Sequence, residues 1–150
     1  MGNFIQTYRL RYLTEENTPE YGFSDQRIIG KIVSVYDGDT CTAIVCINGR
    51  YQRIKIRCQG YDSPELRPSK NLPNRYQEIS KAKDAKTALE RFCLNKIVKL
   101  HIHGFDKYGR FLATIYIKKI CGKVNINQEM LRAGHGYEYY GGKKRDPDQV

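Results

Sequence analysis

Five strand-like segments, separated by turn signals and by one helical segment, constrain the fold of this chain more than any other feature. Apolar and often β-branched side chains alternate with polar ones along them, as expected for strands with one buried face. The segments are Arg27–Val35, Cys41–Ile47, Gln52–Arg57, Ile97–Ile102 and Phe111–Ile117. Asn48-Gly49, between the second and the third, is typical of a two-residue hairpin turn. We therefore expect short strands in a meander, which is typical of a small barrel.

A helical segment interrupts the strands after the third one. From Tyr76 to Leu94, apolar residues recur at spacings of three and four, with Lys and Glu on the opposite face. Asn95 ends this predicted helix, to which we assign a structural role at one end of the barrel. A second, shorter helix is predicted over about Asn125–Ala133, with Gly134 as its C-cap.

These elements predict an α+β protein that is mainly β: a five-stranded OB-fold barrel with a helix after strand 3 and a short helix after strand 5. The 150 residues suffice for one ordinary domain. We divide the chain into an N-terminal extension (1–27), the barrel domain (28–142) and a basic, polar tail (143–150). The extension has little periodicity. We expect it to be irregular and to pack on the barrel through its apolar side chains Phe4, Tyr8, Leu10, Tyr12 and Leu13.

Positive charge is concentrated in the barrel domain and the tail. The chain has 26 basic and 16 acidic residues, a net charge of +10, and residues 28–150 alone carry +11. Small domains usually stay within about 8 charges of neutrality, so this excess favours a polyanionic partner such as nucleic acid. No apolar run approaches the roughly 18 residues of a membrane span, so we expect no membrane partner.

The cysteines predict a reducing environment. Their number is odd and no Cys-x-x-Cys spacing occurs, so neither a disulfide framework nor a zinc site is indicated. The N-terminus lacks the layout of a secretory signal. We therefore expect an intracellular location, in the cytoplasm or an equivalent reducing compartment. The five cysteines are Cys41, Cys46, Cys58, Cys93 and Cys121.

A charged loop follows the third strand-like segment, in the sequence Arg-Cys-Gln-Gly-Tyr-Asp-Ser-Pro-Glu (57–65). Pro64 ends the strand, so Asp62 and Glu65 project from a loop that a rigid strand holds, a usual place for reactive groups. Two carboxylates beside the Arg57 guanidinium suggest a metal and an anion, of which a phosphate diester is the obvious example. The alternative is a solvated turn with a surface ion pair.

Two further charged motifs lie between strand-like segments. A hairpin turn explains Asp37 and Gly38 in Tyr-Asp-Gly-Asp-Thr (36–40), but it does not require Asp39, a second acid that weakens the start of the next strand. The motif Asp-Lys-Tyr-Gly-Arg (106–110) separates the last two strand-like segments. A hairpin with a solvated tip is the alternative there.

Taken in order, Asp-Gly-Asp-Thr, then Arg-x4-Asp-Ser-Pro-Glu, then Asp-Lys-Tyr-Gly-Arg resemble the motifs of the staphylococcal (thermo)nuclease family. The spacing also agrees, with 18 residues from Asp39 to Arg57 and 45 from Glu65 to Arg110. The resemblance covers about Ile28 to Gly142, which is most of the chain. Three motifs in sequence, with strands in the right places, are far more specific than any one of them.

The resemblance implies a metal-dependent nuclease that hydrolyses DNA, RNA or both with little sequence specificity. Asp39 and Asp62, with the backbone carbonyl of Ser63, are expected to bind one hard cation through oxygen. That cation is Ca²⁺ if the family is followed, although carboxylate ligands alone do not exclude Mg²⁺ or Mn²⁺. Ser63 stands where the family usually has threonine, which a backbone ligand tolerates.

The resemblance also implies the roles of the remaining site residues. Glu65 is expected to act as the general base on the attacking water, and Arg57 and Arg110 to stabilise the phosphate charge from two sides. Attack would break the 5′ P–O bond and leave a 3′-phosphate. The expected substrate-binding residues are Lys107, Tyr108 and Tyr140.

Other functions compete with this interpretation. The first is a catalytically inactive OB-fold module that binds nucleic acid or protein, and such domains lack one or more of the acids and arginines that are all present here. The second is a structural protein in which the acids merely form ion pairs with the arginines. A histidine-based hydrolase or zinc site is disfavoured, because the histidines lie outside the motifs. We expect a monomer, since no feature of the sequence indicates an interface.

Overall fold

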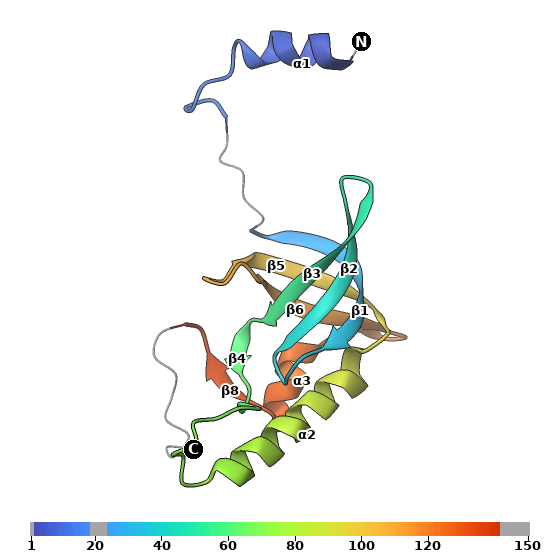
Figure 1. Cartoon of the computed structure of the whole chain (residues 1–150). Helices are drawn as coiled ribbons and strands as arrows, with labels where there is room; N and C mark the ends of the chain where they lie inside the picture. The colour runs from blue at the N-terminus through green and yellow to red at the C-terminus, as the bar shows by residue number, and fades with distance from the viewer. Residues whose placement is uncertain (1, 19–23, 142–150) are drawn as a thin grey trace.

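Five strands close into a barrel because the two edges of one sheet meet. The strands are β1 (Gln26–Val35), β2 (Thr40–Ile47), β3 (Arg50–Cys58), β5 (Ile97–Phe105) and β6 (Phe111–Lys119). They follow the order β3-β2-β1-β5-β6 with antiparallel neighbours, and a parallel pairing of β3 with β6 closes the ring. Figure 1 shows this computed structural model, which describes residues 2–18 and 24–141. The predicted five-stranded barrel is therefore confirmed.

Three short strands were not predicted. β4 (Gly60–Asp62) pairs with β8 (Tyr137–Tyr139) in a separate two-stranded sheet, and β7 (Gly122–Asn125) extends the barrel sheet beyond β6. Strands of three or four residues are too short to show an alternating pattern, so the sequence carries no signal for them. The β4–β8 pairing matters for the site, because it fixes the loop after β3 against the tyrosine-rich C-terminal segment.

The predicted hairpin turn between β2 and β3 is confirmed. Asn48 and Gly49 have φ values of 51° and 75°, and the strands pair in register from Ile47↔Arg50 to Thr40↔Arg57. Positive φ at both central residues is what a two-residue turn of this type requires. The register places Arg57 directly beside the start of β2, where the second charged motif lies.

Both predicted helices are present within a residue or two of their expected bounds. α2 (Arg75–Cys93) buries its alanine-rich face against the barrel, and Asn95 follows it with a φ of 60°. α3 (Ile126–Arg132) begins after Asn125, whose side chain accepts a hydrogen bond from the Gln128 N–H at 3.2 Å. Gly134, with a φ of 74°, ends it as predicted. Figure 1 shows both helices at one end of the barrel.

The core fills the barrel and continues beneath the helices. Its largest fully buried side chains come from every barrel strand, from β4 and from the helices α2 and α3. Burial of each contributes about 1.5–3 kcal/mol to the stability of the fold. These side chains are Ile32, Val45, Ile56, Tyr61, Leu89, Val98, Leu100, Ile102, Ile115 and Met130. This packing makes the barrel a rigid support for the loops at its rim.

The N-terminal extension differs from its prediction. Gly2–Leu10 forms a helix, α1, where an irregular segment was expected. The side chains of Tyr8, Leu10 and Tyr12 are 58%, 65% and 64% exposed, so the expected packing on the barrel is wrong for them. Tyr8 and Tyr12 lie one turn apart and pack on each other, with ring centroids 5.4 Å apart. The side chain of Phe4 and the predicted tail lie outside the described residues.

Within the described part of the chain, no helix has the length and apolar character needed to cross a membrane.

Candidate functional site

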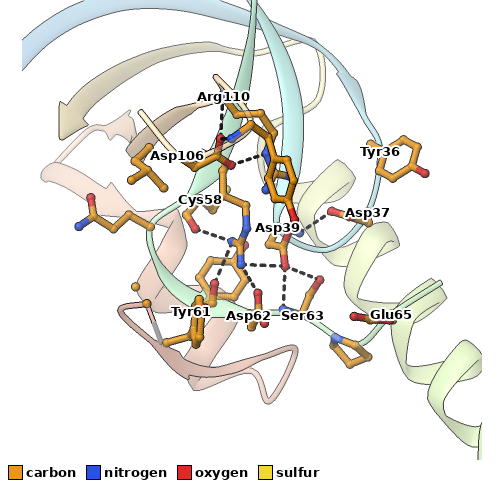
Figure 2. A pocket seen from close by; sticks show the side chains of 18 of the residues that line it. Tyr36, Asp37, Asp39, Cys58, Tyr61, Asp62, Ser63, Glu65, Asp106 and Arg110 are labelled. Carbon is orange, nitrogen blue, oxygen red and sulfur yellow. Dashed lines mark hydrogen bonds and ion pairs between the residues drawn. The ribbon is translucent and has the colours of Figure 1, made fainter. Parts of the chain in front are cut away.

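One open cavity of about 780 Å³ gathers the three charged motifs at the rim of the barrel. Its walls come from the β1–β2 turn, the end of β3 with the loop after β4, the β5–β6 hairpin and the segment after β8. All nine residues predicted for the site line this cavity: Asp39, Arg57, Asp62, Ser63, Glu65, Lys107, Tyr108, Arg110 and Tyr140. Figure 2 shows the central cluster from close by.

Asp39 is a buried and well-anchored carboxylate at the start of β2. One of its oxygens, Oδ2, accepts hydrogen bonds from the N–H and the Oγ of Ser63 at 2.8 and 2.9 Å. The other oxygen accepts a hydrogen bond from Thr40 Oγ1 at 2.9 Å. Its backbone carbonyl receives the Cys58 N–H at 2.8 Å. These contacts join the β1–β2 turn to the loop after β4.

Arg57 lies between the two acids that were predicted to bind the cation. Its Nη2 forms an ion pair with Asp62 Oδ1 and lies 3.4 Å from Asp39 Oδ2. Its Nη1 donates to the backbone carbonyls of Cys58 and Tyr61 at 2.7 and 2.9 Å. Burial alone lowers the pKa of Arg57, but the Asp39 and Asp62 carboxylates outweigh this effect and raise it above its usual value.

This position of Arg57 adds a detail that the sequence did not indicate. Arg57 is only 8% exposed, and both terminal nitrogens of its guanidinium already have protein acceptors. Two-pronged binding of a phosphate by these nitrogens would therefore require some of the present contacts to exchange. The second oxygen of Asp62 accepts a hydrogen bond from the Tyr137 hydroxyl at 3.2 Å, which couples this acid to β8.

The donors at the centre of the site fit a hard cation. Asp39 and Asp62 offer carboxylate oxygens, which are the ligand type that Ca²⁺ and Mg²⁺ prefer. Burial, and next the negative charge of Asp39, raise the pKa of the half-buried Asp37 to about 6. The described residues include no cluster of three or more acidic, histidine or cysteine side chains suited to a metal. The predicted metal ligands include only two such side chains, Asp39 and Asp62, and the third ligand is the backbone carbonyl of Ser63.

Glu65 lies on the same cavity but apart from the central cluster. Its side chain is exposed, and its backbone N–H donates to Glu78 Oε1 on α2 at 3.1 Å. Figure 2 shows Glu65 beyond Ser63 on the loop that leads to α2, to one side of Asp39 and Asp62. This backbone contact holds the loop, while the exposed carboxylate has access to water.

Arg110 forms the opposite wall and is held by Asp106. Asp106 Oδ2 accepts a hydrogen bond from Arg110 Nε at 2.6 Å, and Oδ1 accepts the backbone N–H groups of Tyr108 and Arg110 at 2.8 and 2.9 Å. Arg110 Nη1 reaches Thr40 Oγ1 at 3.2 Å. Burial raises the pKa of Asp106, but these hydrogen bonds outweigh it and lower the pKa below its usual value.

The tip of the same hairpin presents a charged and aromatic surface to solvent. Tyr108 is 73% exposed. Lys107 Nζ and Arg110 Cζ lie 5.0 and 5.6 Å from the centre of its ring, within the range of cation–π contacts. Tyr140, at 78% exposed, lies on the rim of the cavity. These side chains are accessible to a ligand without any change in the core.

Three residues of the site were not assigned a role from the sequence. Asp37 was explained as a turn residue, and its Oδ1 accepts the Asp39 N–H at 3.1 Å. Asp106 was part of a motif, and its position four residues before Arg110 could have indicated that the two side chains form an ion pair. Tyr137 belongs to an aromatic segment, and only the long-range β4–β8 pairing brings it to Asp62. His101, His103 and His135 do not line the cavity, as expected.

Comparison with known proteins agrees with the motifs. The sequence profile of the family described as "Staphylococcal nuclease homologue" matches residues 55–149, which is more than half of the chain. The chain is 35% identical over 126 residues to an uncharacterized protein of Methanocaldococcus jannaschii, an alignment that covers 73% of this chain and 58% of that protein.

Two relatives have names that describe nucleases. One is a probable staphylococcal-like nuclease of Oryza sativa subsp. japonica, 29% identical over 88 residues, which are 59% of this chain and 20% of the relative. The other is a probable endonuclease of Verticillium alfalfae, 26% identical over 154 residues, with 91% of this chain and 52% of the relative covered. This chain thus spans between 20% and 58% of the length of the three relatives. The profile match, the barrel and the three motifs show that the chain belongs to the staphylococcal nuclease family.

Proposed function

We propose that this protein is a metal-dependent nuclease that hydrolyses phosphodiester bonds of DNA, RNA or both. The observation that carries the proposal is the meeting of Asp39, Asp62, Arg57 and Arg110 in one open cavity, although they come from three separate motifs. Buried acids and arginines in a solvent-accessible cavity are suited to a charged phosphate group. Membership of the nuclease family supports the same conclusion.

The substrate class follows from charge and from the shape of the cavity. The chain carries a net charge of +10, and the cavity is open rather than a closed pocket for a small molecule. The side chains at its accessible rim, Lys107, Tyr108 and Tyr140, suit the backbone and the base faces of a strand. Contacts of this kind read little sequence information, so we expect cleavage with little sequence preference and a strong dependence on salt.

Asp39, Asp62 and the carbonyl oxygen of Ser63 are the proposed ligands of a Ca²⁺ ion, with Mg²⁺ or Mn²⁺ as the other candidates. When bound, such an ion supplies positive charge that polarises a phosphoryl oxygen. The anchoring of Asp39 by Ser63 holds one of these acids in place before any ligand arrives.

The arginines and Glu65 complete the proposed reaction. Glu65 accepts a proton from a water molecule whose oxygen attacks phosphorus, the 5′ P–O bond breaks, and the 5′ oxygen is protonated from solvent. Arg110 donates to the phosphate oxygens as negative charge grows on them, and Arg57 contributes from the other side. This route leaves a 3′-phosphate and a 5′-hydroxyl.

Cleavage assays with single-stranded DNA and RNA, each in Ca²⁺, Mg²⁺ and EDTA, test the proposal. We expect metal-dependent degradation that the double variant Glu65→Gln, Arg110→Ala loses by at least about 10³-fold, because a base and a charge-stabilising group are removed together. Asp84→Asn, Lys83→Ala is the control, since it makes the same charge changes on the exposed face of α2. An equal loss in the control, or no loss in the double variant, would contradict the assignment.

A specific observation favours a second candidate, a protein without catalytic activity in which the acids serve only as ion-pair partners of the arginines. The acids already form ion pairs with the arginines, Asp39 and Asp62 with Arg57 and Asp106 with Arg110. If the wild-type protein and the double variant bind nucleic acid equally and neither cuts it under any of the metal conditions, this second function is the correct one. Action as a monomer in a reducing compartment stays a prediction.

A further inference from the structure

A second hollow, of about 290 Å³, lies on the outer face of the barrel and shares no residue with the cavity described above. β1, β5, β6 and β7 form it, and Figure 1 shows the first three side by side. Three of its lining residues are basic, Arg27, Lys99 and Lys123, and no lining residue is acidic. Histidine, tyrosine and aliphatic side chains complete it. None of the motifs predicted from the sequence includes these residues.

The strand register brings these side chains together. Ile29 lies opposite Lys99 on β1 and β5, and Lys99 lies opposite Tyr116 on β5 and β6. Neighbouring strands are about 4.8 Å apart, so the three residues form one row of roughly 10 Å across the sheet. Lys123, from β7, places its Nζ 4.6 Å from the centre of the Tyr116 ring. Arg27 lies at the next outward position of β1 beside this row.

The charge of this face lacks a matching acid in the hollow. An anion bound among these basic groups would interact favourably with each of them. Asp25, beyond the hollow, has its Oδ1 2.6 Å from His101 Nε2, and this hydrogen bond and, to a smaller extent, the charge of Arg27 lower its pKa. No acidic residue lines the hollow beside Lys99 and Lys123, so these two amines remain available to a ligand that carries several negative charges.

Apolar surface accompanies the charge. Ile29 is 64% exposed, and the Tyr116 ring is partly exposed beside Lys123. A small inorganic anion needs no such surface, whereas a nucleic-acid strand offers base and sugar faces as well as phosphates. Basic side chains next to an accessible aromatic ring are the arrangement with which single strands are bound without sequence preference.

We propose that this outer face, formed by Arg27, Ile29, Lys99, Tyr116 and Lys123, is a second nucleic-acid-binding surface that holds a single strand outside the cleavage cavity. The identity of the strand as the enzyme's own substrate rests on the proposed function, but binding at this face does not require cleavage. From Lys99 to Phe105 the strand β5 spans about 20 Å, and the hairpin with Asp106 and Arg110 follows directly. One strand of the roughly 4–16 nucleotides that OB folds accommodate is suited to contact both places.

The test compares Lys99→Glu, Lys123→Glu with Lys81→Glu, Lys83→Glu, which makes the same charge change on the exposed surface of α2. Both pairs are placed in the non-cleaving background Glu65→Gln, Arg110→Ala, and anisotropy of a labelled single strand of about 16 nucleotides measures affinity. We expect the Lys99→Glu, Lys123→Glu variant to bind at least about tenfold more weakly. The slope of log affinity against log salt concentration should become less steep by about 1.4, because each of two lost phosphate contacts of a single strand contributes about 0.7. The Lys81, Lys83 control should change affinity less than about twofold.

The dependence of kcat/KM on the length of the nucleic-acid strand adds a second test. In protein that keeps Glu65 and Arg110, a strand of about 4 nucleotides fits only the cleavage cavity. A strand of about 16 nucleotides reaches both the cavity and the outer face. The Lys99, Lys123 variant should lose at least about fivefold more kcat/KM with the longer strand than with the shorter one. Lys99→Arg, Lys123→Arg should retain the affinity of the parent, which separates a charge effect from misfolding. Thermal unfolding of each variant shows whether the fold is intact.

Several outcomes overturn the proposal. Equal losses in the two glutamate pairs mean that net charge alone acts, and no loss in the Lys99, Lys123 variant means that the face does not bind nucleic acid. Loss of binding to vesicles of phosphatidylserine, with oligonucleotide binding kept, would assign the face to a membrane surface instead. If the wild-type protein does not cut nucleic acid but its binding of the strand still depends on Lys99 and Lys123, the proposed nuclease function is wrong and the proposed binding surface is supported.

Discussion

Ser63 donates two hydrogen bonds to the same oxygen of Asp39, from its N–H at 2.8 Å and from its hydroxyl at 2.9 Å, although the two residues are 24 positions apart. Arg57 Nη2 is the third group near that oxygen, at 3.4 Å. Ser63 is therefore more than the carrier of a backbone carbonyl. Its side chain and N–H align the two loops that contribute the acids, and Gly38 permits the approach, because a Cβ there would lie 2.7 Å from that of Ser63.

The first prediction concerns the Ser63 hydroxyl. Ser63→Ala should lower the free energy of unfolding by about 1.5–3 kcal/mol, because a hydrogen bond to a buried charged group is lost. Ser63→Thr keeps the hydroxyl, as in the family motif, and should retain most of the stability and activity. Urea unfolding, with cleavage measured on the same samples, checks both variants. Equal effects of alanine and threonine would show that the hydroxyl does not matter.

The second prediction concerns the charge of Arg57. Arg57→Ala leaves Asp39 and Asp62 buried without their common cation, so the protein should lose about 3–5 kcal/mol of stability. Arg57→Lys keeps the charge but not the planar fork, so it should be more stable than the alanine variant and still cut slowly. Thermal unfolding and steady-state cleavage at a fixed salt concentration measure the two effects separately. Full turnover with lysine would contradict the role assigned to the guanidinium.

The third prediction concerns the bound cation. If Asp39 and Asp62 hold Ca²⁺, the ion should raise the Tm of the wild-type protein in proportion to the logarithm of its concentration above Kd, and EDTA should reverse this. Asp62→Asn should abolish the rise, while Asp84→Asn, a matched change on the exposed face of α2, should keep it. The readout requires no activity, so it tests the metal site independently of the nuclease assignment. A Ca²⁺ effect of equal size in Asp62→Asn would place the ion elsewhere.

The sequence predicted much of this molecule because its signals were local. Alternation marked the five barrel strands, the two-residue turn at Asn48-Gly49 fixed the β2–β3 register, and apolar spacing defined α2. Eight of the nine site residues were found through motifs, whose members are close in sequence even where the motifs are distant, and Tyr140 was found through the family resemblance. All nine residues line one cavity, while their roles stay predictions.

The features that the sequence missed depend on contacts between distant residues. Tyr137 reaches Asp62 only because β8 pairs with β4, and strands of three residues show no periodicity. The ion pairs of Arg57 depend on the approach of Asp39 across the β2–β3 register. The helix α1 forms although its described apolar residues Ile5, Tyr8 and Leu10 are 59%, 58% and 65% exposed. The apolar content of this segment indicated packing on the barrel, which the exposure of these residues contradicts.

The fourth prediction concerns Asp106 as a positioning residue for Arg110. Asp106→Asn keeps the shape of the side chain but removes the charge that holds Arg110 Nε at 2.6 Å, so kcat should fall by about tenfold or more while the barrel stays folded. Rescue should not come from Asp106→Glu, because the longer side chain cannot accept the backbone N–H groups of Tyr108 and Arg110 in the same turn. A single-turnover assay measures the loss, and Asp84→Asn is the control for charge.

The pH dependence of stability gives an independent check on Asp106. Its pKa is lower in the folded protein than its usual value, so the folded state binds this proton more weakly than the unfolded state. The contribution to stability is therefore complete above the ordinary aspartate pKa of about 3.9 and is lost as the pH falls through the lower folded value. Asp106→Asn should flatten the acid limb of a stability profile measured by urea unfolding between about pH 5 and pH 2. An unchanged acid limb with reduced kcat would mean that Asp106 acts on catalysis without the ion pair to Arg110 that the structure shows.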